Sequence, residues 1–354
     1  MRAKILLPIV ICFFLFDLSL FSQPATYSVW SAQKANAWYA KYKWINGSNF
    51  IPSTAINQLE MWQADTFDPQ TIDRELGYAE GIGFNTMRVF LHSVVWSEDP
   101  EGFKQRVNQY LAIADKHHIQ TIFVFFDDCW NANAKPGKQP DPKPGMHNSG
   151  WMQDPGRPLK TEADYAELEK YVVDMLTTFK HDPRILLWDL YNEPGNSNKN
   201  FKSSMLLTKV FAWAHAVSPD QPVSAGVWDL DLKDLNDIQL KNSDVITYHC
   251  YDTPDNHEKL VQRLKLNGRP VICTEYMARP RNSTFENTMP MLKKENVGAI
   301  NWGFVSGKTN TIYAWDTPMP DGSEPKLWFH DIFRKDGTPY KKAETDLIKQ
   351  LNGK

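Results

Sequence analysis

Short runs of hydrophobic residues recur along the chain, and between them lie longer segments with hydrophobic residues at helical spacing. The short runs are rich in β-branched and aromatic residues, which indicates buried strands. They predict strands at 45–52, 84–91, 119–126, 187–193, 222–228, 244–251, 270–276 and 299–304. The periodic segments predict helices at 71–81, 102–118, 163–181, 201–217, 257–266, 284–296 and 340–351, after a lead-in over 30–44 that begins as a helix.

This regular alternation predicts parallel strands, because a helix must return the chain to the start of the next strand. Eight such strands fit a closed (β/α)8 barrel, the TIM barrel, which is an α/β fold. We expect one barrel domain over residues 23–354, since this fold typically needs about 250 residues plus insertions. A doubly wound open sheet is the alternative. It is disfavoured because no glycine-rich phosphate-binding loop follows a predicted strand.

The N-terminus has the pattern of a secretory signal peptide. Arg2 and Lys4 precede an apolar run over residues 5–21, and small residues follow the run. The run carries Asp17 and is short for a membrane span, so we expect cleavage rather than stable membrane insertion. Residues 1–22 are therefore predicted as the signal peptide of a secreted or periplasmic protein.

Removal of that segment leaves an odd number of cysteines, Cys129, Cys250 and Cys273. All three lie at or near the ends of predicted strands, where we expect them to be buried as small apolar side chains. The chain has no C-x-x-C or H-E-x-x-H spacing. A metal site is therefore poorly supported, and no cofactor is expected.

Composition narrows the class of partner. The net charge of −3 argues against nucleic acid, which favours a basic face. The chain has 13 tryptophans, and indole rings that are not needed in the core can stack on the flat apolar faces of sugars. We expect two or three of the tryptophans near strand ends to line sugar subsites, among Trp130, Trp151, Trp228, Trp315 and Trp328. Rings that stack in this way would favour a carbohydrate partner, whereas core packing is the other explanation of the same rings; the expected state is a monomer.

Polar residues gather where the predicted strands end. Two apolar runs end in a glutamate, at Glu193 and at Glu275. The C-terminal ends of barrel strands carry the active site, so these two carboxyls would face one substrate as an acid and a base. The other candidate residues at strand ends are Arg88, Asp127, Asp128, Asn192, His249, Tyr251 and Trp302. Because an arginine in an apolar strand is costly without a carboxylate beside it, Arg88 predicts a buried acid nearby.

Five of these segments resemble clan A glycoside hydrolases, especially glycoside hydrolase family 5, the cellulase and mannanase family. They are Met87–Val89, Tyr191–Pro194, His249–Tyr251, Thr274–Tyr276 and Asn301–Gly303. The tripeptide Asn-Glu-Pro alone is a weak signal. The five segments together occur in the order of the family and span nearly the whole mature chain.

The resemblance implies a β-glycoside hydrolase that works by a retaining mechanism, and the predicted signal peptide implies that it is secreted. Glu193 would be the general acid/base and Glu275 the nucleophile. One carboxyl must be protonated to give a proton to the leaving oxygen, and the other must be ionised to attack the anomeric carbon. Arg88 would keep Glu275 ionised, and Tyr251 would donate a hydrogen bond to it.

The resemblance also implies that Asn192 binds the 2-hydroxyl of the sugar, that His249 lies near the acid/base, and that Trp302 forms the floor of the cleaved subsite. The chain departs from the family after the third strand, where members often have a histidine. Here the segment reads Phe126-Asp127-Asp128-Cys129-Trp130. Asp127, Asp128 and Trp130 are the candidates for sugar contact or support at this place.

Other functions stay open at this stage. The segment Trp188–Glu193 also resembles family 10, so a family 10-like endo-β-1,4-xylanase is an alternative. A second alternative is a carbohydrate-binding barrel that has lost catalysis. The retention of both glutamates disfavours it. Glucan, mannan and xylan remain possible substrates, and endo or exo action depends on whether the loops 131–160 and 305–330 block one end of the cleft.

Overall fold

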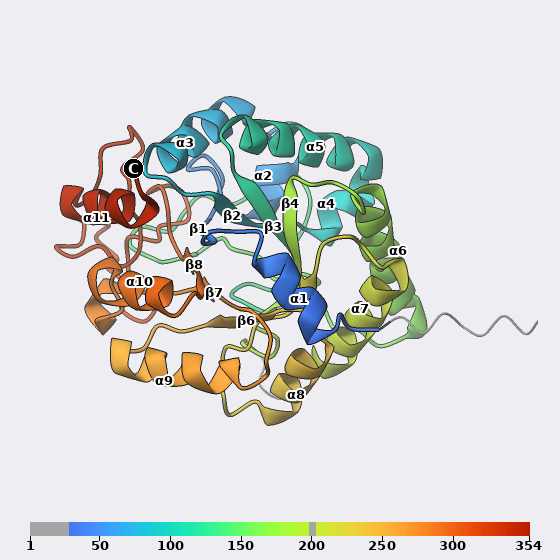
Figure 1. The fold of residues 1–354 in the computed structure, drawn as a ribbon. Helices are drawn as coiled ribbons and strands as arrows, with labels where there is room; N and C mark the ends of the chain where they lie inside the picture. Colours follow the sequence, from blue (N-terminus) through green and yellow to red (C-terminus); the bar gives the residue numbers. More distant parts are fainter. Residues whose placement is uncertain (1–27, 198–202) are drawn as a thin grey trace, which may run out of the picture.

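The computed structural model describes residues 28–197 and 203–354, so the predicted signal peptide lies outside the described residues. Eight parallel strands form one sheet in the order β5-β4-β3-β2-β1-β8-β7-β6 (Figure 1). The strands are β1 (Asn46–Asn49), β2 (Thr86–Phe90), β3 (Gln120–Asp127), β4 (Ile185–Asn192), β5 (Val223–Ser224), β6 (Ile246–His249), β7 (Val271–Glu275) and β8 (Gly298–Asn301). The predicted (β/α)8 barrel is confirmed.

The barrel closes between β5 and β6 through a single parallel bridge from Val227 to Tyr248. The predicted strand at 222–228 is correct in place but wrong in length, because β5 ends at Ser224. The next backbone amide, that of Ala225, donates a hydrogen bond to the hydroxyl oxygen Oγ of Ser243 rather than to a neighbouring strand. A side chain thus takes the place of a ladder partner and ends the strand early.

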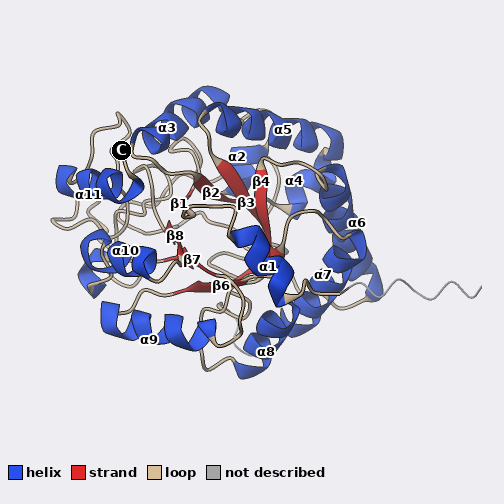
Figure 2. Ribbon diagram, in the orientation of Figure 1, coloured by secondary structure: helices blue, strands red, loops and turns tan. Residues whose placement is uncertain are grey.

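The helices, apart from the first, surround the sheet on its outer side (Figure 2). They are α1 (Ala32–Tyr39), α2 (Gln58–Trp62), α3 (Pro69–Gly81), α4 (Ser93–Glu98), α5 (Pro100–Lys116), α6 (Glu162–Thr178), α7 (Ser203–Val217), α8 (Lys233–Asn242), α9 (Pro254–Lys265), α10 (Phe285–Lys294) and α11 (Lys342–Asn352). All seven predicted helices are present. The helix α8 was not predicted, because its buried positions include Asn236 and Gln239 and give little hydrophobic periodicity.

One end of the barrel is closed by α1, which crosses the barrel axis in Figure 1. Its residues Ala35, Trp38 and Tyr39 belong to one buried cluster with residues of the strands, including Ile122 and Leu187. This apolar plug seals the N-terminal end of the strands. A substrate can therefore reach the strands only from their C-terminal ends. Within the part of the chain that the structure describes, no helix is long and apolar enough to cross a membrane.

Candidate active site

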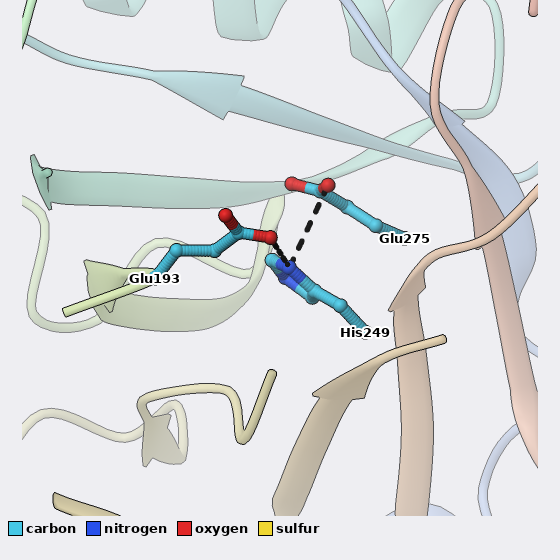
Figure 3. Close-up of side chains that lie close together, drawn as sticks. All are labelled: Glu193, His249 and Glu275. Carbon is cyan, nitrogen blue, oxygen red and sulfur yellow. Dashed lines mark hydrogen bonds and ion pairs between the residues drawn. The ribbon is translucent and has the colours of Figure 1, made fainter. Parts of the chain in front are cut away.

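The two strand-end glutamates meet at the C-terminal mouth of the barrel. Glu193 directly follows β4 with a φ of 42°, a left-handed conformation that is uncommon for a residue with a side chain. Glu275 is the last residue of β7. One oxygen of each carboxyl and a ring nitrogen of His249 all lie within 4.8 Å of one another (Figure 3). The strained backbone of Glu193 thus serves to aim its side chain at Glu275.

Both oxygens of Glu275 accept hydrogen bonds. Arg88 donates from Nη1 to Oε1 at 2.9 Å, and the hydroxyl of Tyr251 donates to Oε2 at 2.8 Å. A cation and a hydroxyl donor both favour the ionised carboxylate. They also fix the direction of its lone pairs.

Arg88 is fully buried in β2 and pairs with more than Glu275. Its Nε donates to Asp189 at 2.9 Å, and its Nη2 donates to the side-chain oxygen of Asn192 at 2.6 Å. The side chain of Asn49 accepts a further bond from Nη1 at 2.8 Å. The buried acid predicted for Arg88 is therefore present twice, as Asp189 and as Glu275. The guanidinium connects the nucleophile candidate to the amide expected to bind the sugar.

Glu193 has a different environment. Its Oε2 accepts from the thiol of Cys129 at 3.3 Å and from the amide of Asn196 at 2.5 Å. Its Oε1 lies 2.8 Å from Nδ1 of His249. Burial lowers the pKa of His249 to about 4, so the ring is neutral at neutral pH. The atoms in contact with Glu193 are then uncharged.

These environments separate the protonation states of the two carboxyls. Burial raises the pKa of Glu193, and hydrogen bonds from Cys129 and Asn196 and the charge of Arg88 act against it. Burial also raises the pKa of Glu275, and so does the charge of Glu193 when it is ionised, but Arg88 and Tyr251 act against it. The direct ion pair with Arg88 decides the state of Glu275, because a hydrogen-bonded guanidinium stabilises a carboxylate strongly. Glu193 can hold a proton while Glu275 is ionised.

The two aspartates after β3 have separate roles. Asp127 is buried and accepts from Trp151 Nε1 at 2.7 Å and from Asn192 Nδ2 at 2.9 Å, which fixes the amide of Asn192. Burial raises the pKa of Asp127 to about 7. Asp128 does not line the central cavity. It accepts instead from the amide of Gly195 at 2.6 Å and so holds the loop after β4.

A cavity of about 590 Å³ lies above the two carboxyls and is called the central cavity below. Five tryptophans line it, Trp130, Trp151, Trp228, Trp302 and Trp315. Four of the five tryptophans considered for sugar subsites are therefore at the cavity, one or two more than expected. The fifth, Trp328, is buried and stacks on Tyr340 with ring centroids 4.5 Å apart. The three cysteines are free and buried, as expected.

Some residues of this site were missed from the sequence. Asp189 lies in the apolar run that ends in Glu193, and a charged residue in that run is the same signal that identified Arg88. The sequence predicts only a small buried apolar side chain at Cys129, whereas in the structure its thiol contacts Glu193. Asn196 and Asn148 stand in loops, where asparagine is common in turns and gives no distinct signal.

The central cavity combines an ionised carboxylate, a second carboxyl that can hold a proton, and stacking surfaces for rings. A pair of carboxyls about 5 Å apart is the arrangement that cleaves glycosidic bonds with retention. An inverting pair lies further apart, at roughly 6.5–9.5 Å, to admit a water molecule. One oxygen of each carboxyl lies within 4.8 Å of an oxygen of the other, which is closer to the spacing of a retaining pair than to that of an inverting pair.

Comparison with known structures gives the same fold. An endo-β-1,4-mannanase from Thermotoga petrophila aligns with a TM-score of 0.58 and 15% identity, covering 88% of this chain and 76% of that one. The GH5_18 protein from Streptomyces cattleya, in complex with GlcNAc, gives 0.60 and 13%, covering 87% and 79%. A family 5 mannosidase from Rhizomucor miehei gives 0.56 and 12%, covering 88% and 92%. No curated protein sequence matches the chain.

The sequence model of one family matches residues 47–307, a stretch that runs from β1 past β8. Its description is cellulase, glycosyl hydrolase family 5. The match includes both glutamates, Arg88 and the aromatic floor at Trp302. The family 10 alternative is thereby set aside. Since the match covers well over half of the chain, this protein belongs to glycoside hydrolase family 5.

Proposed function

We propose that the protein is an exported, retaining β-glycoside hydrolase that cleaves β-linked oligo- or polysaccharides by double displacement. The observation that carries this proposal is the asymmetry of the carboxyl pair. Glu275 accepts from Arg88 and Tyr251, whereas the neighbours of Glu193 are uncharged. One group is thus prepared as a nucleophile and the other as an acid.

In the first step the carboxylate of Glu275 attacks the anomeric carbon while the bond to the leaving oxygen breaks. Glu193 gives its proton to that oxygen, and a glycosyl ester on Glu275 remains. In the second step Glu193, now ionised, takes a proton from water, and the water oxygen displaces Glu275 from the anomeric carbon. Asn192, which Arg88 and Asp127 hold by hydrogen bonds, would bind the 2-hydroxyl in both transition states.

The trio of Glu193, His249 and Glu275 also has spacing that a metal ion could use. A substrate role is better supported than a metal role. Both oxygens of Glu275 already accept hydrogen bonds from Arg88 and Tyr251. The guanidinium of Arg88, 2.9 Å from Oε1, would also repel a metal cation bound to the same carboxylate. The trio is therefore assigned to proton transfer and nucleophilic attack.

The test is turnover of aryl β-glycosides by the mature chain, with the configuration of the first-formed product followed by proton NMR. β-Mannosides are the first probes because several similar structures are mannanases or mannosidases, followed by β-glucosides and β-xylosides. The β-anomer should appear first and then mutarotate. Initial formation of the α-anomer would contradict double displacement. Binding without turnover would favour the carbohydrate-binding alternative.

Glu193→Ala should distinguish substrates by their leaving group. We expect kcat/KM for a substrate with a poor leaving group, such as an unactivated disaccharide, to fall roughly 10²–10⁴-fold. A dinitrophenolate ion leaves without a proton, so kcat/KM for a dinitrophenyl glycoside, which reports the breaking of the glycosidic bond, should change little. Steady-state kinetics on both substrates measures the difference. Equal losses on the two would contradict the acid role.

The pH profile should respond to Asn196. Activity requires protonated Glu193, so kcat/KM falls as pH rises through the pKa of that group. Asn196 donates to Oε2 and thereby stabilises the carboxylate form. Asn196→Ala removes this donor, which should raise the pKa and move the alkaline limb to higher pH. Ser197→Ala is the matched control, since Ser197 lines the cavity next to it and its bond to Asp128 uses only the backbone. A shift in the opposite direction would refute the assignment.

A further inference from the structure

The loops after β3 and β8 join each other across the mouth of the barrel. Together they are called the loop wall, which comprises residues 128–160 and 302–341. The amide of Asn148 donates to the carbonyl of Thr309 at 2.8 Å. Further hydrogen bonds between the two loops link Met319 to Gly145, Asn310 to Lys143 and His147 to Tyr313. Because the bonds are spread along both loops, the wall is one connected structure rather than two separate flaps.

The loop wall is also tied to the segment after β1. The amide of Lys308 donates to the carbonyl of Ser53 at 3.1 Å, and Gln58 Nε2 donates to the carbonyl of Met152 at 3.0 Å. A third bond runs from Asn57 Nδ2 to the carbonyl of Gly150. The C-terminal ends of β1 and β2 are therefore covered.

Aromatic side chains fill the space beneath this cover. The ring of Phe90 packs edge-on against Trp151 at 5.0 Å and against Trp302 at 5.9 Å, and the two indoles are 5.5 Å apart. The remaining cavity beside them measures about 20 Å³. That volume holds about one water molecule and no sugar ring. The central cavity thus does not continue over β1 and β2 as a groove.

The positions of the two carboxyls show which end of a substrate meets the wall. Glu193 must face the leaving oxygen, so the leaving group lies on its side, where Asn196, Ser197 and Trp228 line the cavity. The sugar that is attacked lies on the side of Glu275. There Tyr251 contacts Glu275, and the ring of Trp315 in the loop wall lies 4.9 Å from that of Tyr251. The part of the wall that carries Trp315 therefore stands behind the attacked sugar.

Among the described residues, one polar group of the wall that also lines the central cavity is left without a partner. Asn148 lines the central cavity, is 1% exposed and has a φ of 45°. Its side-chain oxygen Oδ1 is buried and has no hydrogen-bond partner among the described residues. A buried acceptor without a donor costs stability, and such a group in a binding cavity is commonly satisfied by the ligand.

We propose that the protein acts from the non-reducing end and releases one terminal sugar per turnover. The oxygen of Asn148 accepts a hydrogen bond from a hydroxyl of that sugar. The inference rests on the proposed function and adds the mode of action. A closed end behind Glu275 leaves no room for a second sugar on that side, whereas the side of Glu193 accepts leaving groups of different length.

The mode of action is tested on linear β-1,4-pentaoses of mannose, glucose and xylose that carry a fluorescent label at the reducing end. With native protein the labelled product should shorten by one sugar at a time, and the unlabelled product should be a monosaccharide. Labelled disaccharide or trisaccharide as the first product would mean internal cleavage and would overturn the proposal.

The same experiment separates this proposal from the function on which it rests. Internal cleavage by the native protein that is lost in Glu275→Ala would leave the retaining hydrolase intact and reject only terminal action. No cleavage of the pentaoses or of aryl β-monoglycosides would reject both.

Asn148→Ala tests the contact with the terminal sugar. We expect kcat/KM to fall about 10-fold, as for loss of one hydrogen bond, and by the same factor on aryl β-monoglycosides and on the pentaose. Asn133→Ala is the matched control, because Asn133 lies in the same loop with a φ of 64° but does not line the central cavity. Both variants lose an asparagine from a left-handed position, so their melting temperatures should fall alike. Unchanged kinetics for Asn148→Ala, or an equal loss for Asn133→Ala, would overturn the contact.

Discussion

Glu275→Ala is expected to abolish turnover, with kcat lower by roughly 10⁴-fold or more. The substitution removes the group that forms the glycosyl ester in the proposed mechanism, so the first step has no nucleophile. Binding of the sugar should survive, because the lining tryptophans and Asn192 remain. Kinetics on an aryl β-glycoside and calorimetric titration with a non-cleaved sugar measure the two properties separately.

Azide should restore part of this activity. The ion fits in the space that the carboxylate leaves and attacks the same face of the anomeric carbon, while the activated aryl group departs. Because only one displacement then occurs, the product is the α-glycosyl azide. Formation of this product, identified by NMR, would establish Glu275 as the nucleophile. Substantial turnover by the variant without azide would show that Glu275 is not the nucleophile.

The barrel, and the two glutamates that meet at its mouth, could be predicted because both depend on short stretches of sequence. An apolar run that ends in Asn192 and Glu193, or in Glu275, specifies a strand and its chemistry together. The position of Arg88 within an apolar strand likewise predicted a neighbouring group. A buried guanidinium requires a carboxylate, and the structure supplies it in Asp189 as well as in Glu275.

What could not be predicted depends on contacts between distant segments. The thiol of Cys129 reaches Glu193 only because β3 and β4 are neighbours in register, with Asp127 beside Asn192. A cysteine among apolar residues is more often a small core residue, so its sequence context did not indicate that Cys129 contacts Glu193. The length of β5 was missed for a similar reason, since the hydroxyl that ends it belongs to Ser243.

The loop wall shows the limit of local patterns more fully. Its hydrogen bonds join residues such as Asn148 and Thr309, and neither loop has a periodic pattern that indicates the pairing. The glycines and prolines identify loops but not their partners. The structure was therefore needed to distinguish an open groove from a closed cavity, and the proposal of terminal cleavage rests on that distinction.

Arg88→Met is expected to impair both folding and catalysis. Removing the guanidinium leaves Asp189 and Glu275 buried without their cation, which typically costs about 3–5 kcal/mol of unfolding free energy. The pKa of Glu275 should rise, because burial then acts without the opposing charge of Arg88. Since the nucleophile must be ionised, the acidic limb of kcat/KM should move to higher pH. At the native optimum kcat should fall by roughly 10²–10³-fold.

Arg279→Met separates the structural effect from the catalytic one. Arg279 is also buried and pairs with a carboxylate, donating to Glu344 at 2.8 Å from Nε and at 2.6 Å from Nη2, and neither residue lines the central cavity. Denaturant unfolding should show a similar loss for the two variants. The pH profile of kcat/KM should stay native in Arg279→Met and shift in Arg88→Met. If both variants lose stability and both keep the native profile, Arg88 only supports the fold. A shift confined to Arg88→Met means that the buried guanidinium sets the ionisation of Glu275, and with it the division of labour between the two carboxyls.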